Sequence, residues 1–248
     1  MNALIKTMVF IEYMKLRRQW LWTVLITVPL VSCLLGYNNF FTYQDILVQK
    51  EDNEWTEAWT QASLFYGMIM LPILSGFYCS LSCRNENSGG GWKQMLVLPP
   101  SRVIVYIAKM LVILLLVFVT QLVLILEFII TGSLFGIQDP IPWSFLFKVL
   151  VLGFLAVCAL VALQLWMASQ IKSFVTPIAI NVALTLLAFV AAGAEWGNFY
   201  PWAQPTLAMS SPDEVGINSL MFFLSINLMT FSLAAILGVF TFNKKDIY

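Results

Sequence analysis

The sequence predicts an all-α polytopic membrane protein with six transmembrane helices. Of its 248 residues, 60% are hydrophobic and 10% are charged, and the mean hydropathy is +0.85. Soluble domains average roughly 45 to 50% apolar and about 25% charged residues. The 13 basic and 13 acidic residues balance, so the chain has no net field to attract phosphate, which argues against a nucleic-acid partner.

Six apolar runs are long enough to cross a bilayer, whose hydrocarbon core of about 30 Å needs on the order of 20 helical residues. They cover residues 20–37, 62–83, 104–135, 143–169, 174–194 and 217–242. The segments between them are too short for a folded domain outside the membrane. Residues 1–248 are therefore interpreted as a single transmembrane domain that acts in or beside the bilayer.

The charges between the runs separate into two sides, and short loops rich in Lys and Arg stay in the cytoplasm. One side carries most of the cations: Lys6, Lys15, Arg17, Arg18, Arg84, Lys93, Arg102, Lys109, Lys172, Lys244 and Lys245. The other side carries Lys50 and Lys148 and nine acids: Asp45, Glu51, Asp52, Glu54, Glu57, Asp139, Glu195, Asp213 and Glu214. Both termini are therefore expected in the cytoplasm, with an acidic outer face that steers cationic molecules or simply reflects this bias.

Several kinds of chemistry lack their residues. The chain has no histidine, so Ser-His and Cys-His hydrolases and histidine-containing zinc sites are excluded. The four cysteines all lie inside predicted spans without a C-x-x-C pair, so they are expected to pack rather than bind metal: Cys33, Cys79, Cys83 and Cys158. No G-x-x-x-x-G-K-[ST] phosphate loop occurs. We expect no catalytic residue, no metal and no cofactor on this chain, and any ATP-driven motor must be another polypeptide.

The N-terminal segment, residues 1–19, is largely apolar and contains no helix breaker. Glu12 and Lys15 stand near its end, and Trp20 and Trp22 follow. Because aromatic and basic residues favour the headgroup region, we expect a helix that lies at the inner interface, anchored there by its basic end. The alternative is a charged flank that only fixes the orientation of the first span.

The segment between the second and third spans, residues 84–102, differs from an ordinary loop. The helix is expected to end at Arg84, before Glu86 and a glycine turn at 89–91. Residues 92–98 then have the length of about two helical turns and stop at the pair Pro99–Pro100, which cannot continue a helix.

The third span is expected to begin after Ser101, which has the side chain of an N-cap, with Arg102 and Lys109 at the membrane face. A short helix across a cytoplasmic loop could pass a push from a soluble motor to the spans. A merely flexible turn is the alternative.

These features together resemble an ABC-2 type permease. The resemblance rests on E-x-x-K-x-R-R from Glu12, on six spans, on the loop E-N-S-G-G-G-W-K-Q-M-L-V-L-P-P-S-R from Glu86 with V-Y-I-A-K after it, and on the tail N-K-K-D-I. The size of the chain and the sequence of this loop are most similar to the permease subunits of lantibiotic immunity transporters, of the LanE and LanG type. This implies an exporter in a bacterial cell membrane that expels amphipathic antimicrobial peptides.

The resemblance also implies the partners and the coupling site. It implies an ATP-binding subunit, in two copies, that holds ATP and Mg, and a second related permease or a second copy of this chain. The coupling residues that it implies are Glu86, Gly90, Trp92, Lys93, Pro99 and Arg102. It further implies an amphipathic outer segment at 195–214, whose aromatic residues favour an interfacial or re-entrant position among membrane lipids over a seventh span.

Polar residues inside the spans are candidates for a transport pathway or for helix contacts. They are Gln121, Glu127, Gln164, Asn181, Asn218 and Asn227. Amides in spans commonly join helices, at about 0.6 kcal/mol each on average. Glu127 lies 18 residues after Lys109, roughly 27 Å along a helix, so it is expected near the outer interface as a wetted or paired acid.

Three other functions share this hydropathy pattern. The closest alternative is an ABC-2 permease for a drug, a lipid or another peptide. A membrane scaffold or sensor without transport activity would have the same spans. An intramembrane enzyme is disfavoured because histidine is absent and Glu127 is the only acid deep within a span.

Overall fold

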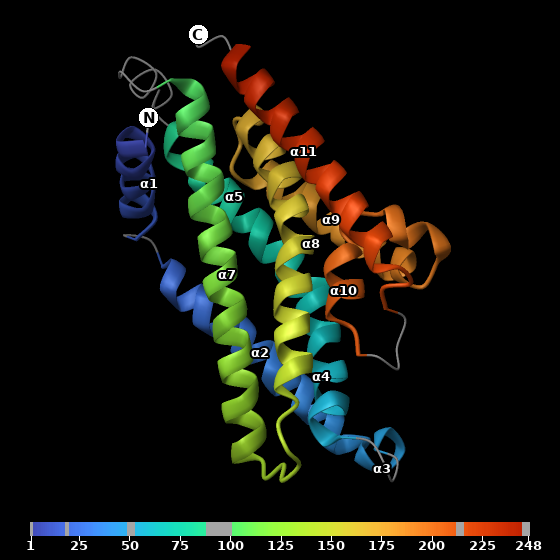
Figure 1. Cartoon of the computed structure of the whole chain (residues 1–248). Helices are drawn as coiled ribbons and strands as arrows, with labels where there is room; N and C mark the ends of the chain where they lie inside the picture. Colours follow the sequence, from blue (N-terminus) through green and yellow to red (C-terminus); the bar gives the residue numbers. More distant parts are fainter. Residues whose placement is uncertain (1, 18–19, 49–52, 88–100, 212–215, 245–248) are drawn as a thin grey trace.

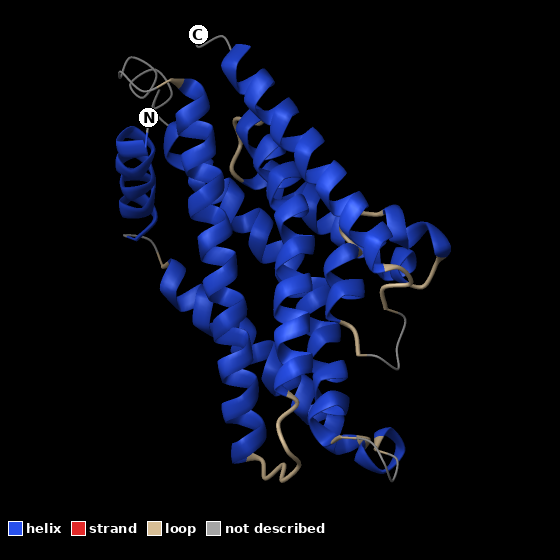
Figure 2. Cartoon of the chain, in the orientation of Figure 1, coloured by secondary structure: helices blue, strands red, loops and turns tan. Residues whose placement is uncertain are grey.

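The computed structural model describes residues 2–17, 20–48, 53–87, 101–211 and 216–244, and these contain helices and no strand (Figure 2). The long helices are α1 (Asn2–Arg17), α2 (Leu21–Thr42), α4 (Glu54–Phe65), α5 (Leu71–Asn87), α7 (Arg102–Leu134), α8 (Trp143–Gln170), α9 (Val175–Ala192) and α11 (Leu220–Lys244). The short ones are α3 (Gln44–Leu47), α10 (Gln204–Met209), the π-helix η1 (Tyr66–Met70) and the 3-10 helix η2 (Glu195–Phe199).

The prediction of six spans is confirmed for the part of the chain that the structure describes. Six helical segments are long and apolar enough to cross a membrane: Leu21–Thr42, Glu54–Arg84, Arg102–Leu134, Trp143–Gln170, Val175–Ala192 and Leu220–Lys244. The protein is therefore an all-α, multi-pass membrane protein.

The second span begins eight residues before the expected start at Ala62, because its first turns are polar on a buried face. Thr60 and Gln61 are buried there, so a hydropathy window does not register them as part of a span. The side chain of Asn53 caps the helix by accepting from the amide of Trp55 at 2.9 Å. Helices α4, η1 and α5 then follow one another without a break.

Helix α8 is central to the bundle (Figure 1), where it packs against α5, α7, α10 and α11. Helix α2 packs against α4 and α7, and α9 packs against α5 and η2. Helix α1 and the last turn of α11 lie at one end of the bundle, here called the α1 end. Helix α3 and the loop at 135–142 lie at the other, here called the α3 end.

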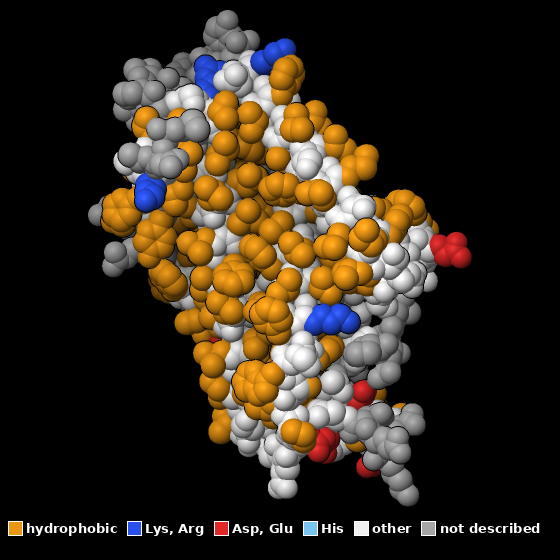
Figure 3. Space-filling model, in the orientation of Figure 1, with side chains coloured by type: hydrophobic (Ala, Val, Ile, Leu, Met, Phe, Trp, Pro, Cys, Tyr) orange, Lys and Arg blue, Asp and Glu red, His pale blue; other side chains and the backbone are white. Residues whose placement is uncertain are grey.

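Charged side chains follow these two ends. On the face drawn in Figure 3, most Lys and Arg lie near the α1 end, Asp and Glu lie toward the α3 end or on the segment around η2, and the surface between is apolar. This is the two-sided distribution that the sequence predicts. The α1 end is thus the end expected in the cytoplasm.

Helix α5 runs through Asn87, three residues beyond the expected end at Arg84. The prediction that the chain leaves the helix at Arg84 was therefore wrong, because Glu86 is held by contacts with other helices that the local sequence does not reveal. Ser101 caps α7 as expected, and its hydroxyl accepts from the amide of Ile104 at 3.4 Å.

The segment after α9 contains only the short helices η2 and α10. Helix α10 packs against α8, η1 and α4 rather than lying on the surface. Trp59 in α4 donates from Nε1 to the carbonyl of Met209 at 2.8 Å, which fixes the end of α10 inside the bundle. The segment thus returns into the protein, and residues 212–215 lie outside the described part.

Candidate functional site

Four charged side chains form a compact group at the α1 end, here called the ion cluster: Glu12, Lys15, Glu86 and Lys109. Lys109 Nζ lies 2.8 Å from Glu12 Oε2 and 3.1 Å from Glu86 Oε1. Lys15 Nζ lies 2.7 Å from Glu12 Oε1 and 2.9 Å from Glu86 Oε1. Two acids and two cations thus alternate, and each contacts both groups of opposite charge.

The ion cluster joins three separate elements. Glu12 and Lys15 belong to α1, Glu86 to the last turn of α5 and Lys109 to the second turn of α7. Lys109 also donates to the carbonyl of Ser82 at 2.7 Å. Because the segment 88–100 connects α5 to α7, the ion cluster ties both ends of that segment to each other and to α1.

Burial of the ion cluster makes each pairing matter. The side chains of Glu12, Glu86 and Lys109 are 1%, 4% and 1% exposed, and only Lys15 reaches solvent at 30%. Burial raises the pKa of Glu86, but the cations of Lys109 and Lys15 outweigh it and hold that pKa below its usual value. The two carboxylates and the two ammonium groups balance, so the ion cluster has no net charge as a whole.

One expectation about these residues was wrong: Lys109 was expected at the membrane face, yet its side chain is buried beside Glu12 and Glu86. Glu86 is buried as well, and the glycine turn expected beside it at 89–91 lies outside the described residues. The physical reason is the partner on α1, because Glu12 supplies the second carboxylate that a buried Lys109 needs. Because Glu86 is buried, it can influence another subunit only by fixing the positions of α1, α5 and α7.

The other predicted coupling residues have different outcomes. Gly90, Trp92, Lys93 and Pro99 lie outside the described residues. Arg102 donates from a guanidinium nitrogen to the carbonyl of Asn243 at 2.8 Å, which joins the start of α7 to the end of α11. The α1 end is thus connected from α1 through α5 and α7 to α11.

A second polar group lies deep in the bundle and contains no charge. Here called the amide junction, it consists of the Pro72 carbonyl, Gln164, Asn181 and Trp202. The Pro72 carbonyl accepts from Gln164 Nε2 at 3.0 Å and from Asn181 Nδ2 at 2.8 Å. Asn181 Oδ1 accepts from Gln164 Nε2 at 2.8 Å and from Trp202 Nε1 at 2.7 Å. It therefore joins α5, α8, α9 and the segment before α10.

The predicted span amides divide into bonded and unbonded groups. Gln164 and Asn181 are helix contacts, and Asn227 donates to Gln204 Oε1 at 3.1 Å. Gln121 is buried with neither amide atom hydrogen-bonded to a described residue. Glu127 is half-buried, and its Oε2 is likewise buried without a partner.

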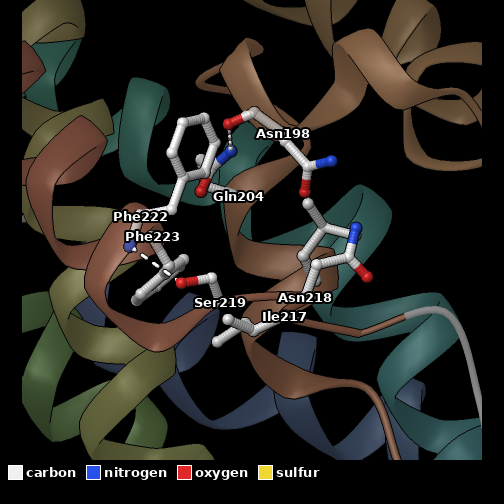
Figure 4. A pocket seen from close by; sticks show the side chains of 8 residues that line it. Asn198, Gln204, Ile217, Asn218, Ser219, Phe222 and Phe223 are labelled. Carbon is white, nitrogen blue, oxygen red and sulfur yellow. Dashed lines mark hydrogen bonds between the residues drawn. The ribbon is translucent and has the colours of Figure 1, made fainter.

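Two pockets among the described residues are notable, one for its small size and one for its apolar lining. The pocket in Figure 4, lined by Asn198, Gln204 and the start of α11, has a volume of about 10 Å³, room for about one water. A groove of about 340 Å³ runs between α7, α8 and α11, lined by Leu114, Leu155, Cys158, Leu224, Asn227, Leu228 and Phe231. The first is too small for a transported molecule, and the second is almost entirely apolar.

Metal and disulfide chemistry is not found in the described part of the chain. The four cysteines form no disulfide with one another, and three of them are fully buried, as packing residues would be. No group of three or more metal-ligating side chains occurs among the described residues. The candidate site is defined by the ion pairs of Glu12, Lys15, Glu86 and Lys109.

Sequence reasoning missed that Glu12 and Lys15 face inward. Their spacing of three residues is a signal for one helix face, but it does not say whether that face meets lipid headgroups or protein. Asp139 was missed in the same way: its Oδ2 accepts from the amide of Glu54 at 2.9 Å and so caps α4. The contacts of Glu12 with Lys109, of Lys15 with Glu86 and of Asp139 with Glu54 all join residues more than 70 positions apart.

The fold and the ion cluster define a multi-pass membrane protein in which buried ion pairs join α1, α5 and α7. Residues 8–188 match the family described as ABC-2 family transporter protein, which is well over half of the chain. The chain therefore belongs to the ABC-2 transporter family and is a membrane permease subunit, of a kind that works with an ATP-binding subunit. No curated protein matches the chain.

Proposed function

We propose that this chain is the permease of an ATP-driven exporter that takes amphipathic antimicrobial peptides of the lantibiotic type from the membrane and expels them outward, for immunity of the producing cell. Two copies of an ATP-binding subunit would hold ATP and Mg, and a second permease or a second copy of this chain would complete the path. The α1 end would face the cytoplasm. The ion cluster is the observation that carries the coupling part of this proposal.

The segment 88–100 lies in the sequence between α5 and α7, two of the three helices that the ion cluster joins. A motor that binds this segment can act on the spans through α5 and α7, because both helices are covalently attached to it. The ion cluster binds these ends to α1, so the three elements move together at little internal strain. Breaking the cluster would leave charges unpaired in a buried place, which is strongly unfavourable. We therefore expect force on the segment to reach α1, α5 and α7 together.

The position of the described helices and the surface charge support a cargo that is taken from the membrane. Most of the described chain lies in spans or against them, so a cargo that is already in the bilayer is reached without an external receptor. Acids gather toward the α3 end (Figure 3). A cationic amphipathic molecule would be attracted to that end, over the 8 to 10 Å that salt leaves unscreened at about physiological strength.

A tagged pull-down from mild detergent tests the partner. The native chain is compared with a Trp92→Ala, Lys93→Ala variant in the proposed coupling segment and with Lys172→Ala, which removes an exposed charge between α8 and α9. We expect an ATP-binding subunit with the native chain and the Lys172 control, and much less with the segment variant. Recovery of no ATP-binding subunit from folded native protein would contradict the proposal.

A protection assay tests the cargo. Cells that produce the complete complex are exposed to a cationic lantibiotic, with and without a hydrolysis-dead ATP-binding subunit. We expect protection only with the active motor. If ATP hydrolysis changes tolerance to a drug or alters lipid distribution instead, the permease acts on that other substrate. If it changes none of these, a non-transporting role is favoured.

A further inference from the structure

Glu127 is a carboxylate inside a span with no cation provided for it by the described residues. It lies seven residues before the end of α7, about 10 Å along the helix, and forms no hydrogen bond or ion pair with any residue that the structure describes. The ion cluster shows the opposite arrangement, in which every buried charge is paired. An ionisable group in a span without such a partner marks a functional site by default.

The surroundings of Glu127 are polar but uncharged. Cys33 of α2 and Tyr66 of η1 lie close enough to interact with it electrostatically. Cys33 Sγ lies 3.9 Å from the carbonyl of Leu124, one turn before Glu127, which places the carboxylate beside the contact of α7 with α2. The Tyr66 hydroxyl is buried without a hydrogen-bond partner. These groups supply polarity without a counter-charge.

Aromatic rings continue from Glu127 toward the α3 end along the same helix pair. Tyr37 stacks on Phe128 with ring centroids 5.1 Å apart, and Phe41 meets Phe135 at 5.5 Å. Phe41 and Phe135 are exposed on the outside of the helix pair. Exposed aromatic rings offer a large apolar surface for the hydrocarbon part of a ligand. Exposed rings about two helical turns from an unpaired carboxylate therefore suit a molecule that is both cationic and apolar.

We propose that Glu127, with Phe41 and Phe135, forms a binding site for the ammonium or guanidinium group of an amphipathic molecule that arrives laterally from the membrane near the α3 end. The apolar part of that molecule contacts the exposed rings, and its cation completes the ion pair that the protein leaves open. This inference rests on the proposed function and deepens it, because it assigns the cargo contact to one residue.

The test uses the full chain in lipid nanodiscs and two fluorescent probes that differ only in charge, a dodecylammonium and the matched dodecanol. We expect the native chain to bind the ammonium about tenfold more tightly, since a hydrogen bond to a charged group is worth at least one decade of affinity. Glu127→Gln should abolish this preference and Glu127→Asp should keep part of it. Phe41→Leu with Phe135→Leu should weaken binding of both probes a few-fold, because the rings contact the apolar chain that the two probes share, and it should leave the preference for ammonium in place.

Glu195→Gln is the matched control, because Glu195 is an exposed acid of η2. It should leave the preference unchanged. The site is refuted if Glu127→Gln keeps the preference for ammonium, or if Glu195→Gln removes it equally, which would indicate general surface charge. Glu127→Gln is almost isosteric and removes a charge from the membrane, and thermal unfolding verifies that the variant is folded.

The protection assay separates this inference from the proposed function. If the native complex gives no protection while Glu127→Gln still abolishes probe selectivity, the peptide-export proposal fails and the site stands. If the native complex protects, and Glu127→Gln changes neither protection nor selectivity, the export proposal stands and the site fails.

Discussion

The ion cluster and the amide junction both join helices through buried polar groups, but they do so by different means. In the ion cluster, two acids and two cations depend on one another, and the loss of a buried member, such as Lys109, leaves a net charge in a buried place. In the amide junction, neutral groups share one carbonyl and one amide, and the loss of one removes only its own hydrogen bonds. A charged joint therefore holds its elements together as a unit, whereas a neutral joint can lose its bonds one at a time.

The difference fits the positions of the two groups in the bundle. The ion cluster holds the ends of the segment 88–100, where the resemblance to ABC-2 permeases expects force from an ATP-binding subunit. The amide junction holds the segment before α10 against α5, α8 and α9. We infer that the α1 end moves as one body and that the bundle interior tolerates smaller, separate rearrangements.

The largest expected effect is on Lys109, which is the fully buried cation of the ion cluster. Lys109→Ala should lower the free energy of unfolding by about 3 to 5 kcal/mol, because it leaves Glu12 and Glu86 with Lys15 alone. Thermal unfolding in mild detergent measures this loss. The matched control is Lys172→Ala, an exposed residue at the same end of the bundle, and equal stability of both variants would contradict the structure of the cluster.

A smaller loss is expected at the amide junction. Asn181→Leu removes the donor to Pro72 and the acceptor for Gln164 and Trp202, for about 1 to 3 kcal/mol in total. Trp202 fluorescence should also change, since its indole N–H loses its partner. The exposed Asn218→Leu serves as the control. If Asn181→Leu lowers the free energy of unfolding as much as Lys109→Ala does, the ion cluster and the amide junction contribute equally to stability, and the proposed difference between them is wrong.

Acid should weaken the ion cluster and spare the amide junction. The folded pKa of Glu86 lies below the ordinary value of 4.5, so its stabilising contribution is complete above that value and is lost as the pH falls through the folded pKa. Unfolding measured from neutral to acidic pH should show this loss in the native chain, and to a smaller extent in Glu86→Gln. Identical pH profiles for the native chain and Glu86→Gln would show that Glu86 is not held by its cations.

The smallest effect is expected for Lys15, which is the solvent-reaching member of the cluster. Lys15→Ala should cost about 1 kcal/mol or less, because a partly exposed ion pair is screened by water and salt. Lys109→Ala is the direct comparison, since both residues contact the same two acids. If both variants lose the same free energy of unfolding, the number of charges and not their burial determines the stability of the cluster.

Predictions made from the sequence were most accurate where composition alone decides the structure. The six spans, the N-cap at Ser101 and the packing role of the cysteines needed only hydropathy, a local capping preference and the lack of histidine. They were least accurate at the start of the second span, where polar side chains such as Gln61 are buried against α2. Hydropathy treats such a residue as outside the membrane because it measures the side chain and not what surrounds it.

For the candidate site, the sequence singled out Glu86 and Glu127 but could not assign their partners, and it placed Lys109 only at the membrane face. The pairing of Glu12 with Lys109 spans 97 positions, and helix periodicity carries information only within a few turns. The same limit applies to Asn181, whose contacts lie on three other elements. The loop residues Gly90, Trp92, Lys93 and Pro99 remain predictions.

The sequence by itself determined that this protein spans a membrane six times, with one basic and one acidic end, because the transfer of apolar and charged side chains depends on each residue separately. Only the tertiary structure decided which charges are neutralised within the protein. It paired Glu12, Lys15, Glu86 and Lys109 and left Glu127 without a described counter-charge, because ion pairing depends on which helices lie side by side. The first is a property of residues and the second is a property of their arrangement in space.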